Sequence, residues 1–176
     1  MGKMNIGEIM KPIGILLTCF LCLTACFYAD HDYQTIENTA VLDYAIQHLP
    51  HTGVLLQKSD GFVYLKVDDA YIHALFPKLK AHGFHKPPYF RRPDAVGAHI
   101  SVMYNEETRQ RQPIEEVGQV FQFTPSKLAM VRVRGRSQYV ILEVQAPELE
   151  ALRKKYGLSP MLKQHAFHIS LAKRAL

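Results

Sequence analysis

Two copies of the tripeptide His-Ile-Ser carry the side chains of this sequence that are best suited to acid–base chemistry. They occupy residues 99–101 and 168–170. Each copy lies in an apolar run that predicts a β-strand, over residues 98–104 and 166–172. Side chains at positions i and i+2 of a strand project to the same face. Each histidine is therefore expected beside its serine, with the isoleucine turned to the opposite face.

These residue types suit the cleavage of a phosphodiester without a metal ion. An imidazole titrates near pH ~6.5, so one ring can accept a proton while the other donates one. A serine hydroxyl can donate a hydrogen bond to a phosphoryl oxygen and stabilise the charge that develops there. A strained cyclic phosphodiester is the substrate that this pattern favours most. The candidate catalytic residues are His99 and His168, and the candidate phosphate-binding residues are Ser101 and Ser170.

The elements that position these residues form an internal repeat. Residues 62–104 and 139–173 both predict a strand, a helix, a glycine, a loop and then the strand that carries the tripeptide. Such a repeat predicts two lobes related by an approximate two-fold axis, which would bring both histidines to one cleft. The first copy has the longer loop.

The whole chain predicts an α+β fold in which strands outnumber helices. Ile36 begins a helical pattern that Pro50 ends, and a second helix is expected from Asp69 to His82 with Gly83 as its terminator. A third helix is expected to start at Pro147, because proline is favoured in a first helical turn. The further strands are expected at 53–57, 62–67, 117–124, 127–134 and 138–145.

The chain resembles the 2H phosphoesterases, whose signature is a pair of His-hydrophobic-Thr/Ser-hydrophobic motifs. These motifs are present as His-Ile-Ser-Val at 99–102 and His-Ile-Ser-Leu at 168–171, and the resemblance covers residues 62–173. It implies a bilobal α+β fold with two pseudo-symmetric β-α-β repeats and antiparallel sheets around a central cleft. It also implies an enzyme that acts on 2′,3′-cyclic phosphates or related RNA ends. We expect no cofactor and no metal.

Three further basic residues are candidates for phosphate binding. The second motif continues to Lys173, which is similar to the small-then-basic ending often seen in that superfamily. Arg91 and Arg92 lie in a proline-rich loop with Tyr89 and Phe90. Aromatic rings can stack on a base and arginines can bind phosphate, so this loop could cover the substrate. A solvated loop is the alternative interpretation.

The three cysteines, at positions 19, 22 and 26, all lie in one apolar segment that follows Lys3 and Lys11. This arrangement is typical of a secretory signal, and the run is too short for a comfortable membrane span of about 20 residues. Residues 23–26 resemble a bacterial lipobox. We therefore expect a signal peptide over 1–25, a lipidated Cys26, a tether over 26–35 and the domain over 36–176. Met4 and Met10 are alternative starts.

An export signal changes the expected location and substrate. The resemblance places a lipid-anchored protein in a bacterial cell envelope, with the outer membrane favoured. A nucleotide or another small phosphodiester is then a better candidate substrate than a polymeric RNA. The formal charge of +5 fits an anionic ligand but does not identify one. We expect a monomer.

Two other classes stay open. Nine histidines, with His-x-x-His at 82–85 and 165–168, suggest a metal-binding lipoprotein. The second pair suits a metal poorly on a strand, because positions i and i+3 face opposite sides. An envelope protein that binds nucleotides without catalysis is the other class.

Overall fold

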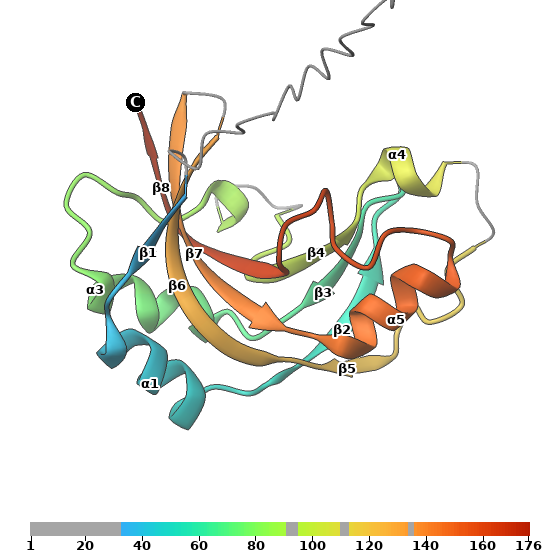
Figure 1. Ribbon diagram of the computed structural model, residues 1–176, viewed down its shortest axis with the longest axis horizontal. Coiled ribbons are helices and arrows are strands. Elements are labelled where there is room, and N and C mark those ends of the chain that lie inside the picture. The colour runs from blue at the N-terminus through green and yellow to red at the C-terminus, as the bar shows by residue number, and fades with distance from the viewer. Residues whose placement is uncertain (1–32, 91–94, 110–112, 134–135) are drawn as a thin grey trace, which may run out of the picture.

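The computed structural model describes residues 33–90, 95–109, 113–133 and 136–176. In these residues one antiparallel sheet of eight strands runs in the order β1-β6-β7-β8-β4-β3-β2-β5. The expectation of separate sheets is wrong in this respect, because β4 pairs with β8 and joins the two halves into one curved sheet (Figure 1). The chain is α+β, as expected.

All the described strands except the first lie where the sequence pattern predicts them, although their lengths differ. The strands are β1 Tyr33–Ile36, β2 Thr52–Gln57, β3 Val63–Lys66, β4 His99–Met103, β5 Val120–Gln122, β6 Thr124–Val133, β7 Ser137–Gln145 and β8 His168–Ala175. The tether expected over 26–35 is wrong from Tyr33 onward, since β1 pairs with β6. This edge strand forms by pairing with a segment distant in sequence, so the local sequence pattern does not predict it. The rest of the predicted tether lies outside the described residues.

The helices show one clear departure from expectation. α1 Thr39–His48 and α5 Pro147–Lys155 form where predicted, and Asn38 caps α1 by accepting a hydrogen bond from the Val41 amide. The helix expected over 69–82 is instead two short helices, α2 Ala70–His73 and α3 Leu75–Leu79. Pro77 has no N–H to donate to the preceding turn, which removes a helical hydrogen bond. α4 Asn105–Thr108 and the 3₁₀ turn Pro88–Phe90 lie between predicted elements.

An aliphatic row crosses the sheet and forms the centre of the core. Cross-strand partners in register connect Ile36, Leu128, Leu142, Ile169, Ile100, Leu65 and Leu55. All but Ile36 are at most 2% exposed. α1 lies near β6 and α3, both α2 and α3 lie near β8, and α5 lies near β4 and the edge strand β5 (Figure 1). Both isoleucines of the His-Ile-Ser tripeptides therefore belong to the core, which turns their neighbours to the opposite face.

Among the described residues, no helix has the length and apolarity needed to cross a membrane. The predicted signal peptide and Cys26 lie outside the described residues.

Candidate active site

The pairing of β4 with β8 brings the two tripeptides together. Ile100 is the cross-strand partner of Ile169. Because the two strands are antiparallel, the residues on either side of this pair also face each other. His99 therefore lies opposite Ser170, and Ser101 lies opposite His168. Residues opposite one another have Cβ atoms about 4.5–5.5 Å apart, and diagonal neighbours are about 7–8 Å apart. The four side chains therefore form one compact cluster on the face of the sheet opposite the aliphatic row.

Both histidines are held by the same local hydrogen bond. The Nδ1–H of His99 donates to the carbonyl oxygen of Gly97 at 2.8 Å, and the Nδ1–H of His168 donates to that of Ala166 at 3.0 Å. In each case the acceptor lies two residues before the histidine, where the loop enters the strand. A carbonyl oxygen only accepts, so each neutral ring carries its proton on Nδ1. The Nε2 lone pair of each ring is then available for a proton or a ligand.

Burial favours the neutral form of both rings. Desolvation lowers the pKa of His99, and the positive charges of Lys66, His168 and Lys58 lower it further, while the hydrogen bond to Gly97 raises it. Desolvation also lowers the pKa of His168, against the hydrogen bond to Ala166 and the charge of Glu143, which raise it. The influence of His168 on His99 agrees with their shared position on one face.

Aromatic rings enclose His99. The ring of Tyr89, from the 3₁₀ turn, meets the His99 ring edge to face at 4.7 Å between centroids. Tyr64 and Phe62 approach the same ring from the β3 side at 5.8 and 6.0 Å. His99 is only 8% exposed. Tyr89 of the proline-rich loop therefore lies against His99.

Three residues close to the histidines have no signal in the sequence that separates them from ordinary strand residues. Lys66 is the cross-strand partner of His99, and Glu143 is the cross-strand partner of His168. Tyr64 is the partner of Ser101, and burial raises the pKa of its hydroxyl. Their places depend on strand register, so a single sequence could not identify them.

Of the remaining predicted residues, Lys173 lies in the described part of the chain, and no contact there joins its side chain to either histidine. Lys173 lies on β8 five positions beyond His168, and its Nζ lies over the ring of Tyr139 at 5.3 Å. It borders a hollow of about 190 Å³ that is also lined by His85, Lys86 and Arg174. Arg91 and Arg92 lie outside the described residues.

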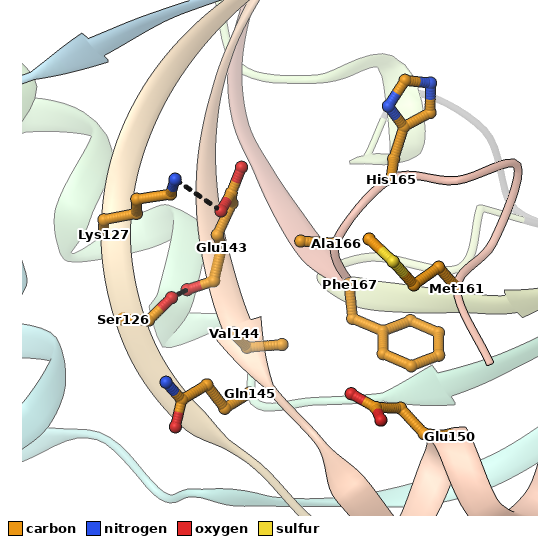
Figure 2. Close-up of a pocket in the computed structure, with 10 residues that line it drawn as sticks. All are labelled: Ser126, Lys127, Glu143, Val144, Gln145, Glu150, Met161, His165, Ala166 and Phe167. Atoms are coloured by element: carbon orange, nitrogen blue, oxygen red, sulfur yellow. Dashed lines mark hydrogen bonds and ion pairs between the residues drawn. The ribbon is translucent and has the colours of Figure 1, made fainter.

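A larger cavity of about 350 Å³ lies beside the cluster and not on it. It separates β6 and β7 from the loop that leads to His168, and Figure 2 shows Lys127 and Glu143 on one side and His165 and Ala166 on the other. Glu143 and Ala166 connect the cavity with the site, since both interact with His168. Met161, Phe167 and Val144 supply apolar lining, and Gln145 and Glu150 supply polar groups.

The metal-binding hypothesis finds no donor cluster in the part of the chain that the structure describes. There, no three His, Cys, Asp or Glu side chains gather closely enough to hold an ion.

Comparison with known families gives one match. A family model described as "Swiss Army Knife, 2H phosphoesterase domain" matches residues 63–176, from the start of β3 to the end of the chain. No curated protein and no solved structure matches the chain.

Proposed function

The chain belongs to the 2H phosphoesterase domain family, and we propose that it hydrolyses a 2′,3′-cyclic phosphate or a related small phosphodiester. The family supports a phosphoesterase in general. The cyclic substrate and the two-histidine mechanism are our proposal.

The observation that carries the proposal is the common arrangement of two imidazoles and two hydroxyls. Both rings have Nδ1 engaged by a backbone carbonyl, so both present Nε2 to the same face of the sheet as the serines. A phosphoryl group placed between the rings could meet a base on one side and an acid on the other. Ser101 and Ser170 would donate hydrogen bonds to its non-bridging oxygens.

The reaction then needs no group beyond these side chains and water. One Nε2 takes a proton from water as the water oxygen bonds to phosphorus. The second ring, protonated at Nε2, gives its proton to the ribose oxygen as the bond from that oxygen to phosphorus breaks. The product is a phosphomonoester, and solvent restores the two protonation states. Such acid–base catalysis typically contributes about 10²–10⁴-fold to a rate.

The cavity beside His168 supports a small nucleotide as substrate. Its volume of about 350 Å³ is within the usual range for ligand sites, roughly 300–1,000 Å³. Its carboxylates, Glu143 and Glu150, disfavour a second phosphate but can accept hydrogen bonds from a base or a ribose hydroxyl. We propose that the nucleoside lies in this cavity while its phosphate lies between the histidines.

The proposed location is the bacterial cell envelope, with a lipid anchor on Cys26 after removal of residues 1–25. A monomer with a membrane-proximal active domain would act on small phosphodiesters outside the cytoplasm. Labelling with palmitate tests the anchor. Incorporation that is lost in Cys26→Ala is expected, and incorporation that persists in this variant would refute it.

Turnover of a 2′,3′-cyclic nucleotide panel in EDTA tests the function. We use the purified full chain in detergent. His99→Ala and His168→Ala should each lower kcat/KM by about 10²–10⁴-fold. His82→Ala is the matched control, because this exposed histidine lies in a turn outside both tripeptides and its loss should leave turnover unchanged.

Two outcomes would decide against the proposal. An absence of turnover on every cyclic nucleotide, with nucleotide binding retained, would favour the non-catalytic envelope protein. Activity that appears only on adding zinc, and that His82→Ala abolishes, would favour the metal-binding protein.

A further inference from the structure

The two strand pairs that carry the tripeptides match residue for residue. β3 pairs with β4 and β7 pairs with β8 in the same register, and both pairs have a register shift at the equivalent step. Equivalent residues meet equivalent partners: Lys66 and Glu143 face the histidines, Leu65 and Leu142 face the isoleucines, and Tyr64 and Ile141 face the serines. The amides of Val67 and Val144 also bond to the carbonyls of Ala98 and Phe167, each one residue before a histidine.

This correspondence shows where the two halves differ in charge. The cross-strand neighbour of His99 is the cation Lys66, whereas the neighbour of His168 is the anion Glu143. A cation beside an imidazole disfavours its protonated form, and a carboxylate favours it. The two rings therefore share the same strand register and the same Nδ1 hydrogen bond, but their cross-strand neighbours have opposite charges.

Both charged neighbours are fixed in place. Lys66 forms an ion pair with Asp69, and its Nζ also lies 3.4 Å from the carbonyl oxygen of Ala98. Asp69 in turn accepts a hydrogen bond from the Ala98 amide at 2.8 Å. These contacts hold the lysine against the loop that orients His99.

Glu143 is buried, with only 8% of its surface exposed. It accepts a hydrogen bond from the Tyr33 hydroxyl at 2.8 Å and lies 3.4 Å from Lys127 Nζ (Figure 2). A buried carboxylate on the strand next to His168 can stabilise an imidazolium that forms there. Lys127, nearly half exposed, offsets this charge only in part.

We infer that His99 is the general base and His168 is the general acid, and that Lys66 and Glu143 assign these roles as positioning residues. This inference rests on the proposed function. Water loses its proton to Nε2 of His99 as it attacks phosphorus. Nε2–H of His168 gives its proton to the leaving ribose oxygen as the phosphorus–oxygen bond breaks.

The groups that act on each ring define the pH response. His99 faces Lys66 and Tyr64 from β3, Tyr89 from the loop and His168 from β8, and it also feels the charge of Lys58. His168 faces Glu143 from β7, His99 from β4 and His165 from its own loop.

The pH dependence of kcat/KM on a 2′,3′-cyclic nucleotide tests the assignment with the full chain. His168→Ala removes the acid, so its residual activity should rise with pH and reach a plateau. His99→Ala removes the base, so its residual activity should be constant at low pH and fall as pH rises. The reverse pattern would overturn the assignment while leaving the proposed function intact. No turnover by the wild-type protein would instead overturn the function.

Glu143→Gln gives an independent readout on an otherwise intact pair of histidines. In the profile of kcat/KM against pH, the falling limb reports the acid His168 and the rising limb reports the base His99. Removing the carboxylate should move the falling limb to lower pH and leave the rising limb in place. At the pH where the wild-type falling limb is half maximal, we expect about two- to fivefold lower kcat/KM. Lys127→Gln is the matched control, because it removes the partner of Glu143 and keeps the carboxylate, so the falling limb should not move to lower pH. A shift of the rising limb in Glu143→Gln would assign His168 as the base.

A substrate with a leaving group that needs no proton supplies the test if Glu143→Gln is unstable. On bis(p-nitrophenyl) phosphate, His168→Ala should retain activity within about tenfold of wild type, whereas His99→Ala should lose about 10²-fold or more. Equal losses in both variants would contradict the division of roles.

Discussion

At the scale of single residues, the orientation of each imidazole depends on the backbone two positions before it. Gly97 and Ala166 supply the carbonyl oxygens that hold Nδ1. Gly97 has a φ of +66°, in the left-handed region that favours glycine. Gly97 is also closely packed. A Cβ at this position would clash with Asp69 Oδ1 and would lie only 2.7 Å from Lys66 Nζ. The site therefore needs glycine at this position for conformation and for space.

We expect Gly97→Ala to lower both stability and activity. The strained φ costs about 1–2 kcal/mol, and displacement of the His99 acceptor should reduce kcat/KM by about 10-fold or more. Gly83→Ala is the matched control, since Gly83 has a φ of +76° but nothing within 4 Å of the added Cβ. Urea unfolding and turnover of both variants separate the two effects. Equal kcat/KM in the two variants would contradict a role of Gly97 in the site.

At the scale of elements, the 3₁₀ turn Pro88–Phe90 controls the environment of His99. Tyr89 covers one side of the ring, and its own carbonyl accepts a hydrogen bond from the Gly97 amide at 3.1 Å. Burial raises the pKa of Tyr89 to about 12, so its hydroxyl stays protonated at neutral pH. Tyr89 is thus a wall of the site and not a proton acceptor.

Tyr89→Ala should raise the pKa of His99, because water would reach a ring whose pKa is lowered chiefly by desolvation. The rising limb of the activity profile, which we assign to His99, should move to higher pH. Tyr89→Phe keeps the ring and should leave the limb unchanged. An NMR titration of the His99 ring measures the same pKa without substrate. An unchanged pKa in Tyr89→Ala would show that Tyr89 does not shield His99.

A second element, α5, is tied to the first half of the chain through Arg153. This side chain is 1% exposed, and its guanidinium forms an ion pair with Glu107 of α4 at 2.8 Å. It also donates to the carbonyls of Val102 and Ser159, both at 2.6 Å. Arg153 therefore joins the end of β4 to the start of the loop that leads to His168.

Arg153→Met should lower the free energy of unfolding by about 3–5 kcal/mol, because Glu107 would lose its buried cation. Lys155→Met is the matched control on the same helix. Lys155 is half exposed and pairs with Glu115 and Glu116 at the surface, so its loss should change stability far less. Urea unfolding at neutral pH measures both variants. Similar losses would argue that the Arg153 network contributes little.

At the scale of the whole molecule, two desolvated neutral histidines make stability depend on pH, since His99 is buried and His168 is half-buried. The pKa values of His99 and His168 are both lowered in the folded protein, chiefly by burial. Below the unfolded value of about 6.5, the unfolded chain therefore binds more protons than the folded one. Acid then favours unfolding until the pH falls below the folded pKa values.

We expect the free energy of unfolding to decrease as the pH falls from 7.5 to 5.5. Urea titrations at a series of pH values measure it. The double variant His99→Gln/His168→Gln should show a smaller decrease over this window. Asp69 and Glu107, whose pKa values are lowered, lose their contribution only as the pH falls below about 4. Unchanged or greater stability at pH 5.5 would contradict the burial of neutral rings.

The tripeptides could be interpreted from sequence because strand alternation is local. The isoleucines at 100 and 169 had to lie on the face opposite to the flanking histidines and serines once their segments were strands, and both isoleucines are fully buried. The same local pattern located most strands, α1 and α5. The sequence resemblance also identified the family that matches residues 63–176.

Only the tertiary structure decided how the two halves meet. The register of β4 against β8 is set by packing between segments about 70 residues apart, so no local pattern reports it. That register, with those of β3 and β7, places Lys66 beside one histidine and Glu143 beside the other. The chain thus encodes two nearly identical motifs locally, and the fold gives them opposite electrostatic surroundings because each strand has a different neighbour.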